Sequence, residues 1–404
     1  MTFQMTRRVW TLAGLMLCVC ATAVFAQQPT PPAGAPPAQG ARGRGGRGGP
    51  PSPEIAANGS ITFRLAAPNA REVRVSGTWS AQPTAMTKDA DGVWSATVGP
   101  LAPEIHTYSF NVDGITVLDP RNTNTKMGYG GFGPVSVVQV PGNGPQFYDM
   151  KPVPHGEVRI LPYESKSLGV SRSMWVYTPP GYDKGSNYPV FYLLHGAGDI
   201  ESGWVMIGRA NAILDNLIAE KKAKPMVVVM PLGHAIQSFY NGPAKASAAA
   251  PAVGGPPAPG ALSLFARDLL EDVIPTVERT YKVSKRADDR AIGGLSMGGG
   301  QSINVAFNKP ELFRYVVLMS PAAPQNADQV YPNFFKDAAA ANKQFKLLWI
   351  GIGKDDTLTG AGTKALDATL TAKGVNHTFV LGEGIHEWYV WRAHLRDTAP
   401  MLFK

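Results

Sequence analysis

The stretch Ile292-Gly293-Gly294-Leu295-Ser296-Met297-Gly298-Gly299 sets the architecture of this chain, because it contains Gly294-x-Ser296-x-Gly298. The G-x-S-x-G spacing is typical of a serine at a sharp turn between a strand and a helix, where its hydroxyl projects from the chain. Flanking glycines let the strand and the helix pass close to one another. Because the chain has 44 glycines, the same pattern could also be a simple glycine-rich turn without a catalytic role. The rest of the sequence must distinguish between these two interpretations.

Apolar runs and helical patterns alternate around this turn. Expected strands, most of them too apolar to face water on either side, occupy residues 188–194, 226–230, 290–293, 315–319, 346–351 and 376–381. Between them, apolar residues recur at helical spacing, as in 210–218 and 262–281. Strands that alternate with helices predict a doubly wound, mostly parallel sheet. An antiparallel pair of strands, 158–163 and 173–178, is expected ahead of it.

An all-β module is predicted for residues 54–141. Short runs with strand patterning begin at residues 61, 73, 93 and 107. Short strands at this spacing indicate a small β-sandwich. Trp79 and Trp94 are open to two interpretations: exposed rings that stack on sugars, or rings packed in the module core or against the next domain.

Residues 1–26 are predicted to be a secretory signal peptide. Arg7 and Arg8 precede the apolar run 9–19, and 24–26 offers compact residues for cleavage. The run is shorter than the about 20 apolar residues of a membrane span, so we expect no stable insertion after cleavage and a secreted or periplasmic protein. The chain has 2 cysteines and both lie in this segment, so a mature chain would hold no disulfide.

Three further segments are poor in residues that could form a core. Residues 27–53 are a Pro/Gly/Arg-rich linker, expected to be disordered; without interleaved aromatics its arginines favour a spacer over nucleic-acid binding. Residues 142–154 are a connector into the C-terminal part of the chain, 155–404, which holds the serine turn. Residues 237–260, rich in Ala, Gly and Pro, are predicted to be a flexible insertion.

A serine nucleophile needs a base, and the base needs an acid that orients it. Asp355 and Asp356 follow an apolar strand, and either could be the acid. His386 follows the last strand within a glycine-rich turn, which favours it as the base over the other six histidines. The order Ser, Asp, His along the chain is that of α/β hydrolases.

Two backbone N–H groups are expected to form an oxyanion hole. One belongs to Met297, directly after the serine, and the other to Ala197 in the loop Leu194-His195-Gly196-Ala197-Gly198. The His195 ring is interpreted as a brace for this loop rather than a proton carrier. Trp204, Tyr240 and Trp388 are expected to contact substrate, and packing in the core is the alternative for Trp388.

Residues 188–403 resemble the esterase D / feruloyl esterase group of α/β hydrolases, carbohydrate esterase family 1. The matching pieces are Leu194-His-Gly-Ala-Gly198, Gly293-Gly-Leu-Ser-Met-Gly-Gly299, Gly353-Lys-Asp-Asp-x-Leu358 and Gly384-Ile-His-Glu-Trp388. The resemblance implies that the acid is Asp356. Many relatives carry a second glycine where this chain has Ile385, a difference that bears on substrate preference.

The module ahead of it resembles immunoglobulin-like, family 48 carbohydrate-binding modules. The matching pieces are Val75-Ser-Gly-Thr-Trp79, Gly92-Val-Trp94 and Asp113-Gly114. Together the resemblances imply an α/β hydrolase preceded by a small immunoglobulin-like sandwich, acting as a serine esterase on feruloyl or acetyl esters of xylan. The rivals are a siderophore (enterochelin-type) esterase, an acyltransferase and a non-catalytic carbohydrate-binding protein.

The expected partner is an ester-bearing carbohydrate or a phenolic ester. The sequence shows no cluster of metal ligands, and Gly298-Gly299-Gly300 lacks the Lys-Ser/Thr of a phosphate loop, so we expect no metal and no cofactor. The oligomeric state is left open.

Overall fold

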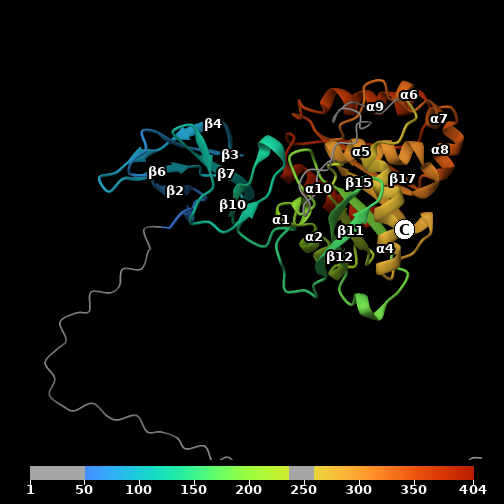
Figure 1. Ribbon diagram of the computed structural model, residues 1–404, viewed down its shortest axis with the longest axis horizontal. Helices are drawn as coiled ribbons and strands as arrows, with labels where there is room; N and C mark the ends of the chain where they lie inside the picture. The colour runs from blue at the N-terminus through green and yellow to red at the C-terminus, as the bar shows by residue number, and fades with distance from the viewer. Residues whose placement is uncertain (1–50, 236–258) are drawn as a thin grey trace, which may run out of the picture. The chain divides into compact units, whose positions relative to one another are not determined.

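The computed structural model describes residues 51–235 and 259–404, and its largest sheet has eight strands (Figure 1). Their spatial order is β11-β12-β14-β13-β15-β16-β17-β18. Their bounds are Glu157–Ser165 (β11), Val170–Thr178 (β12), Val190–Leu194 (β13), Val227–Pro231 (β14), Arg290–Leu295 (β15), Tyr315–Met319 (β16), Leu347–Gly353 (β17) and Thr378–Gly382 (β18). β11, β12 and β14 pair antiparallel and the others pair parallel, so the sheet is mixed and mostly parallel, as predicted.

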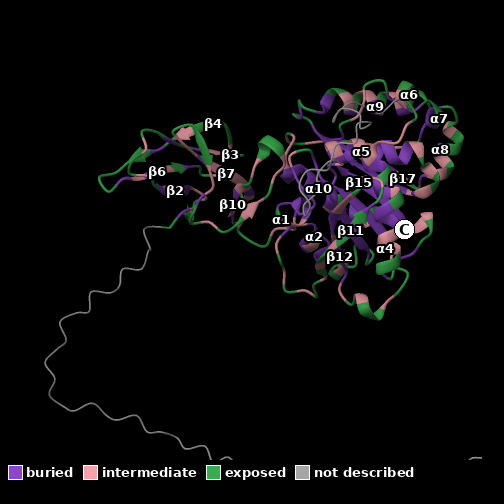
Figure 2. Ribbon diagram, viewed as in Figure 1, coloured by how far each residue is buried: buried purple, intermediate pink, exposed green. Residues whose placement is uncertain are grey.

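Helices cover both faces of this sheet, because the strands are apolar on both sides. Alternate residues of β13 contribute to different cores. Tyr192 belongs to a cluster with residues of 264–280, 297–308 and 360–372, whereas Phe191 belongs to one with residues of 210–219 and 388–398. The helices are α1 (Gly203–Met206), α2 (Ala210–Ala219), α3 (Leu264–Asp268), α4 (Ile274–Thr280), α5 (Met297–Asn308), α6 (Ala327–Val330), α7 (Pro332–Phe335), α8 (Ala338–Gln344), α9 (Gly360–Ala372) and α10 (Trp388–Thr398). Figure 2 shows the central strands as buried.

The predicted long helix over 262–281 is interrupted. A π-helical turn, Leu269–Val273, separates α3 from α4. Pro275 follows at the start of α4 and has no N–H for the usual bond to the preceding turn, which accounts for a change of helical pitch there. The apolar face is kept across the interruption, since Phe265, Leu269 and Val277 are all buried.

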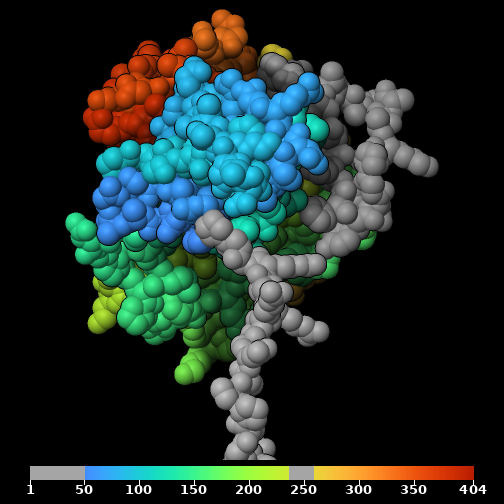
Figure 3. Space-filling model, turned by 90° about the vertical axis from the view of Figure 1, so that its left-hand side faces the viewer, coloured from blue at the N-terminus to red at the C-terminus, as the bar shows by residue number. Residues whose placement is uncertain are grey.

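The N-terminal region is all-β and has two sheets. One has the order β1-β2-β6-β5, and the other has the order β4-β3-β7-β10-β9, with β8 paired to β7. The strands are β1 (Glu54–Ile55), β2 (Ile61–Ala66), β3 (Val73–Gly77), β4 (Ser80–Ala85), β5 (Thr87–Lys88), β6 (Val93–Val98), β7 (Glu104–Val112), β8 (Ile115–Val117), β9 (Thr125–Lys126) and β10 (Val135–Val140). In the space-filling view these residues, blue to cyan, form one continuous block of surface (Figure 3). The immunoglobulin-like topology itself stays a prediction.

The two tryptophans of this region belong to its core. Trp94 is 7% exposed, and its indole N–H donates to the Ala67 carbonyl at 2.9 Å. Trp79 stacks on Phe63 with ring centroids 5.3 Å apart. Of the two interpretations of these residues, packing is therefore the one that their contacts support.

Several sequence predictions concern residues that the structure does not describe. The signal peptide at 1–26 and nearly all of the linker at 27–53 lie outside the described residues, as do residues 237–258 of the predicted insertion. Within the described ranges, the helices are all too short or too polar to cross a membrane.

Candidate active site

Ser296 lies at a strained turn between β15 and α5. Its φ of 51° is in the left-handed region, which side chains other than glycine seldom adopt. A Cβ on Gly294 would come within 2.5 Å of the Leu194 carbonyl oxygen, and one on Gly298 within 2.6 Å of the His195 carbonyl oxygen. Strand β13 therefore passes so close that both flanking positions must be glycine, and the predicted turn is present.

Asp356 and His386 are brought together by the loops that follow β17 and β18. Those loops are hydrogen-bonded to each other, since Lys354 N–H donates to the Gly382 carbonyl at 2.7 Å and Asp355 N–H to the Gly384 carbonyl at 3.0 Å. The His386 Nδ1 lies 2.7 Å from Asp356 Oδ2.

The two adjacent aspartates differ in environment. Asp355 is exposed, whereas Asp356 is 5% exposed. Asp356 also accepts hydrogen bonds from the Thr359 N–H and hydroxyl, both at 2.9 Å. Burial by itself would raise the pKa of Asp356, but the hydrogen bonds from His386 and Thr359 outweigh burial and lower it to about 2. The carboxylate is thus ionised and oriented toward the imidazole.

Ser296 and His386 share one rim of the sheet, at the carboxyl ends of β15 and β18, where open α/β sheets place their sites. Among the described residues, their side chains form no hydrogen bond with each other; such bonds often tighten only when substrate binds. The N–H groups of Ala197 and Met297 likewise have no acceptor within residues 51–235 and 259–404. Both are therefore available to a ligand at this rim.

The His195 ring braces two loops. Its Nδ1–H donates to the Gly196 carbonyl at 2.8 Å, and its Nε2 accepts the Gly233 N–H at 2.8 Å. The side chain is buried, and burial lowers its pKa to about 3. A neutral ring with both nitrogens bonded to the backbone has no free site for proton transfer, which agrees with the interpretation of His195 as a brace.

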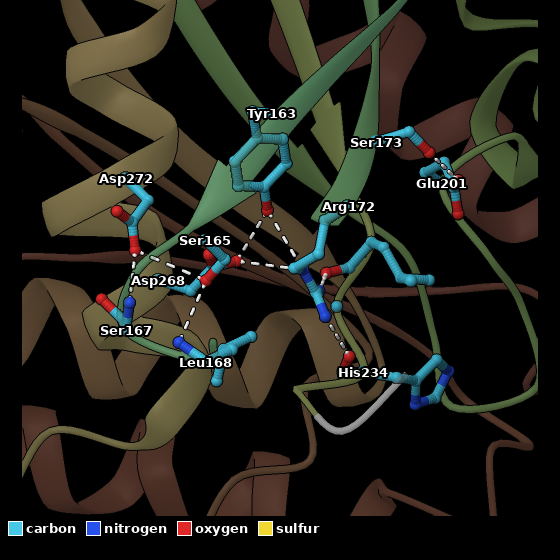
Figure 4. Close-up of polar contacts among 12 residues, drawn as sticks. Tyr163, Ser165, Ser167, Leu168, Arg172, Ser173, Glu201, His234, Asp268 and Asp272 are labelled. Atoms are coloured by element: carbon cyan, nitrogen blue, oxygen red, sulfur yellow. Dashed lines mark hydrogen bonds and ion pairs between the residues drawn. The ribbon is translucent and has the colours of Figure 1, made fainter. Parts of the chain in front are cut away.

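A buried polar network holds the loop that follows β14 (Figure 4). Arg172, on β12, donates to the carbonyls of Leu232 and His234, the latter at 2.8 Å. The Arg172 guanidinium lies 3.4 Å from the Asp268 carboxylate, and both side chains are fully buried. Tyr163 joins the network by donating to Asp268 at 2.8 Å. The edge hairpin β11–β12 is thereby tied to α3 and to the loop that follows β14.

The expected aromatic contacts need correction. Trp204 is fully buried; its indole N–H donates to the Leu194 carbonyl at 3.0 Å, and its ring packs edge-to-face on Trp388 at 5.2 Å. Trp388 is 6% exposed. Both rings fill the core between α1, α2 and α10 and form no wall of an open cleft. Tyr240, the third residue named for this role, lies outside the described residues.

Three side chains near the site were missed by sequence reasoning. Thr359 holds Asp356, and Gln301 donates to the Gly233 carbonyl at 2.9 Å. Tyr129 comes from the N-terminal region and stacks on His234, with ring centroids 3.6 Å apart. Across residues 51–235 and 259–404, no group of three or more His, Cys, Asp or Glu could hold a metal ion.

Comparisons with known proteins show the family of the chain. The model of the Esterase family matches residues 165–402. Among curated proteins, the chain is similar to an endo-1,4-beta-xylanase/feruloyl esterase from Xylanibacter ruminicola, with 32% identity over 361 residues, 87% of this chain and 46% of that protein. It is also similar to endo-1,4-beta-xylanase Y of Acetivibrio thermocellus, with 24% identity over 61% of this chain and 23% of that protein. The chain thus spans less than half the length of these two relatives.

Solved structures show the same fold at low identity. A CE1 ferulic acid esterase from Anaeromyces mucronatus, in complex with ferulic acid, has a TM-score of 0.52 and 23% identity, and the match covers 64% of this chain and 96% of that one. An enterobactin esterase from Shigella flexneri has a TM-score of 0.61 and 20% identity, and that match covers 85% of this chain and 92% of the other.

Proposed function

Because the chain belongs to the Esterase family, we propose that it is a serine esterase that hydrolyses carboxylic esters through an acyl-enzyme on Ser296. The observation that carries the proposal is the bond of 2.7 Å between His386 Nδ1 and Asp356 Oδ2, on the rim where Ser296 projects from its strained turn. A serine, an imidazole and an ionised carboxylate in this arrangement are the parts that acyl transfer requires.

In the first half of the proposed reaction, His386 Nε2 takes the proton of Ser296 Oγ as that oxygen attacks the ester carbonyl. The carbonyl oxygen becomes an oxyanion, which the N–H groups of Ala197 and Met297 stabilise. Asp356 holds the imidazole in the tautomer with Nδ1 protonated and stabilises its positive charge. The tetrahedral intermediate then collapses, His386 gives its proton to the departing alcohol, and Ser296 keeps the acyl group.

In the second half, water takes the place of the alcohol. His386 removes a proton from the water as its oxygen attacks the acyl carbon, and the same two N–H groups bind the new oxyanion. Collapse releases the carboxylic acid and returns the proton to Ser296 Oγ. No other co-reactant is needed.

The proposed substrates are feruloyl or acetyl esters of plant cell-wall polysaccharide, such as xylan. Support comes from the 32% identical relative, whose name joins a xylanase to a feruloyl esterase. The chain spans 46% of that relative, so a xylanase activity is not part of the proposal. The choice of these esters as substrates rests on the names of the relatives and not on a residue of this site.

A siderophore esterase is the second candidate. The enterobactin esterase structure covers 85% of this chain, more than residues 155–404 alone could supply, whereas the ferulic acid esterase structures cover 61% to 64%. At 20% identity this likeness concerns the fold, so the substrate must be decided by assay.

The test is a substrate panel of p-nitrophenyl acetate, methyl ferulate, acetylated xylan and enterobactin, with wild type and Ser296→Ala. We expect turnover of the simple ester and of methyl ferulate or acetylated xylan, and a loss of about 10⁴-fold or more in kcat without the serine. Turnover of enterobactin alone would replace the xylan proposal with the siderophore one. Turnover that survives Ser296→Ala would contradict the acyl-enzyme itself.

We further propose that the protein is exported, on the basis of the basic and apolar pattern of residues 1–26. N-terminal sequencing of the protein from the culture medium or periplasm should begin at Gln27. An intact Met1 on the exported or retained protein would contradict this proposal.

A further inference from the structure

The turn 196–199, which includes Ala197, is held by a segment from outside the large sheet. This segment, 126–132, begins on β9 of the N-terminal region and contacts the turn through side chains and backbone. We infer that Lys126 and Tyr129 are positioning residues of the active site, which fix the turn and thereby the N–H of Ala197. The inference rests on the proposed ester hydrolysis, in which that N–H binds the oxyanion.

The first contact is a nearly buried ion pair. Lys126 Nζ lies 2.5 Å from Asp199 Oδ1, and the two side chains are 12% and 6% exposed. Asp199 closes the turn on itself, because its N–H donates to the Gly196 carbonyl at 3.1 Å and its carboxylate accepts the Gly196 N–H. A buried carboxylate is costly unless it is paired, so the ammonium group stabilises the closed form of this turn.

The charges around Lys126 favour this arrangement. Burial raises the pKa of Asp199, and the ammonium of Lys126 opposes that rise. Glu387, directly after the catalytic candidate His386, behaves alike: burial raises its pKa, and Lys126 is among the groups that oppose the rise. The charge of Lys126 therefore stabilises the Asp199 carboxylate, which it contacts, and also favours the ionised form of Glu387.

The second contact is made by Tyr129. Its N–H donates to the Gly198 carbonyl at 3.3 Å. Its ring stacks on His234 at an interplanar angle of 19°, and the His234 Nε2–H donates in turn to the Asp199 carbonyl at 3.0 Å. The turn is thus bonded at Gly198 and Asp199, the two positions that follow Ala197.

A third contact is made by Phe132 with Gly198. The Phe132 ring lies so near Gly198 that a Cβ on this glycine would come within 2.9 Å of the ring. Neither Lys126 nor Tyr129 is assigned a contact with the reacting atoms. Their role is to limit the positions that the Ala197 N–H can take.

The experiment compares Lys126→Met with Lys126→Arg in the full chain. Lys151→Met is the matched control, because Lys151 also pairs with an acid of the hydrolase part, Glu220 at the C-terminal end of α2, at 3.4 Å. That pair is more open to solvent, since its side chains are 27% and 40% exposed. For each variant we would measure kcat and KM on p-nitrophenyl acetate, the Tm, and the inhibition constant of a trifluoromethyl ketone, whose serine adduct carries an oxyanion.

We expect Lys126→Met to lower kcat by about 10-fold or more, with KM changed by less than about threefold, since oxyanion stabilisation acts in the transition state. Binding of the ketone should weaken by a factor similar to the loss in kcat. Lys126→Arg and Lys151→Met should stay within about threefold of wild type in each quantity. Tyr129→Ala against Tyr129→Phe repeats the test if Lys126→Met does not fold, with the loss expected only for alanine.

Unchanged kcat and ketone binding in Lys126→Met, or an equal loss in Lys151→Met, would overturn the inference. So would a loss of kcat without a loss of ketone binding. These outcomes require a wild type with turnover that depends on Ser296; absence of that turnover would instead contradict the proposed function.

Discussion

The Asp356 carboxylate and the His386 ring meet at 2.7 Å, although 30 positions separate them in the chain. Backbone hydrogen bonds between the loops after β17 and β18 hold the pair together. The orientation of the imidazole is therefore a property of two adjoining loops rather than of one flexible side chain.

Replacing the two adjacent aspartates should have unequal effects. Asp356→Asn removes the charge next to His386 and favours the wrong tautomer, so kcat should fall by about 10⁴-fold. Asp355→Asn alters an exposed side chain and should leave kcat within about twofold. Steady-state kinetics on p-nitrophenyl acetate would measure both. Equal losses would mean that Asp356 is not the acid of the triad.

The same carboxylate should make the stability of the fold depend on pH. Its pKa is lowered to about 2 from an ordinary value of 3.8, so ionisation of Asp356 stabilises the fold above the ordinary value and ceases to do so as pH falls through about 2. The difference in free energy of unfolding between wild type and Asp356→Asn should thus shrink by about 2 kcal/mol as the pH falls from about 5 to about 2. Urea titrations would test this, and a constant difference would contradict it.

His195 should matter for rate without carrying a proton. His195→Phe removes the bonds to Gly196 and Gly233, and we expect kcat to fall by about 10-fold or more as the oxyanion turn loosens. The pH midpoint of kcat/KM should stay where it is in wild type, since the His195 ring carries no proton in the proposed reaction. A displaced midpoint in the His195 variant would assign that ring a share of the proton transfer.

Arg172 should be a major source of stability. Arg172→Met leaves Asp268 buried without its cation and should lower the free energy of unfolding by about 3–5 kcal/mol. Arg159 is a control on the adjoining strand: it pairs with Glu157 at 2.6 Å, but both side chains are more than half exposed. Arg159→Met should cost less than about 1 kcal/mol. Similar values for the two arginines would show that the buried network does little for the fold.

The sequence allowed much of the large sheet and its rim to be predicted. The apolar runs gave the strands, and the glycines around Ser296 indicated a turn pressed against another strand, as found at Leu194 and His195. Asp356 and His386 each follow a strand, and the carboxyl ends of parallel strands lie at the same edge of a sheet. Their positions in the sequence therefore predicted the contact between the two side chains.

Other features could not be predicted from local pattern. The residues that approach the site from the N-terminal region, Lys126 and Tyr129, come from a glycine-rich stretch without periodicity, and their partners lie about 70 or more positions away. Trp204 resembled a cleft residue because it follows the oxyanion loop. Its burial depends on Trp388, which the chain supplies only at the start of α10.

The ion pair of Lys126 and Asp199 also limits how this protein could be recombined with its relatives. A chimera whose new N-terminal region lacks a lysine at this place would leave a buried acid without its cation. Such an exchange should therefore carry the turn 196–199 along with the segment 126–132 that contacts it.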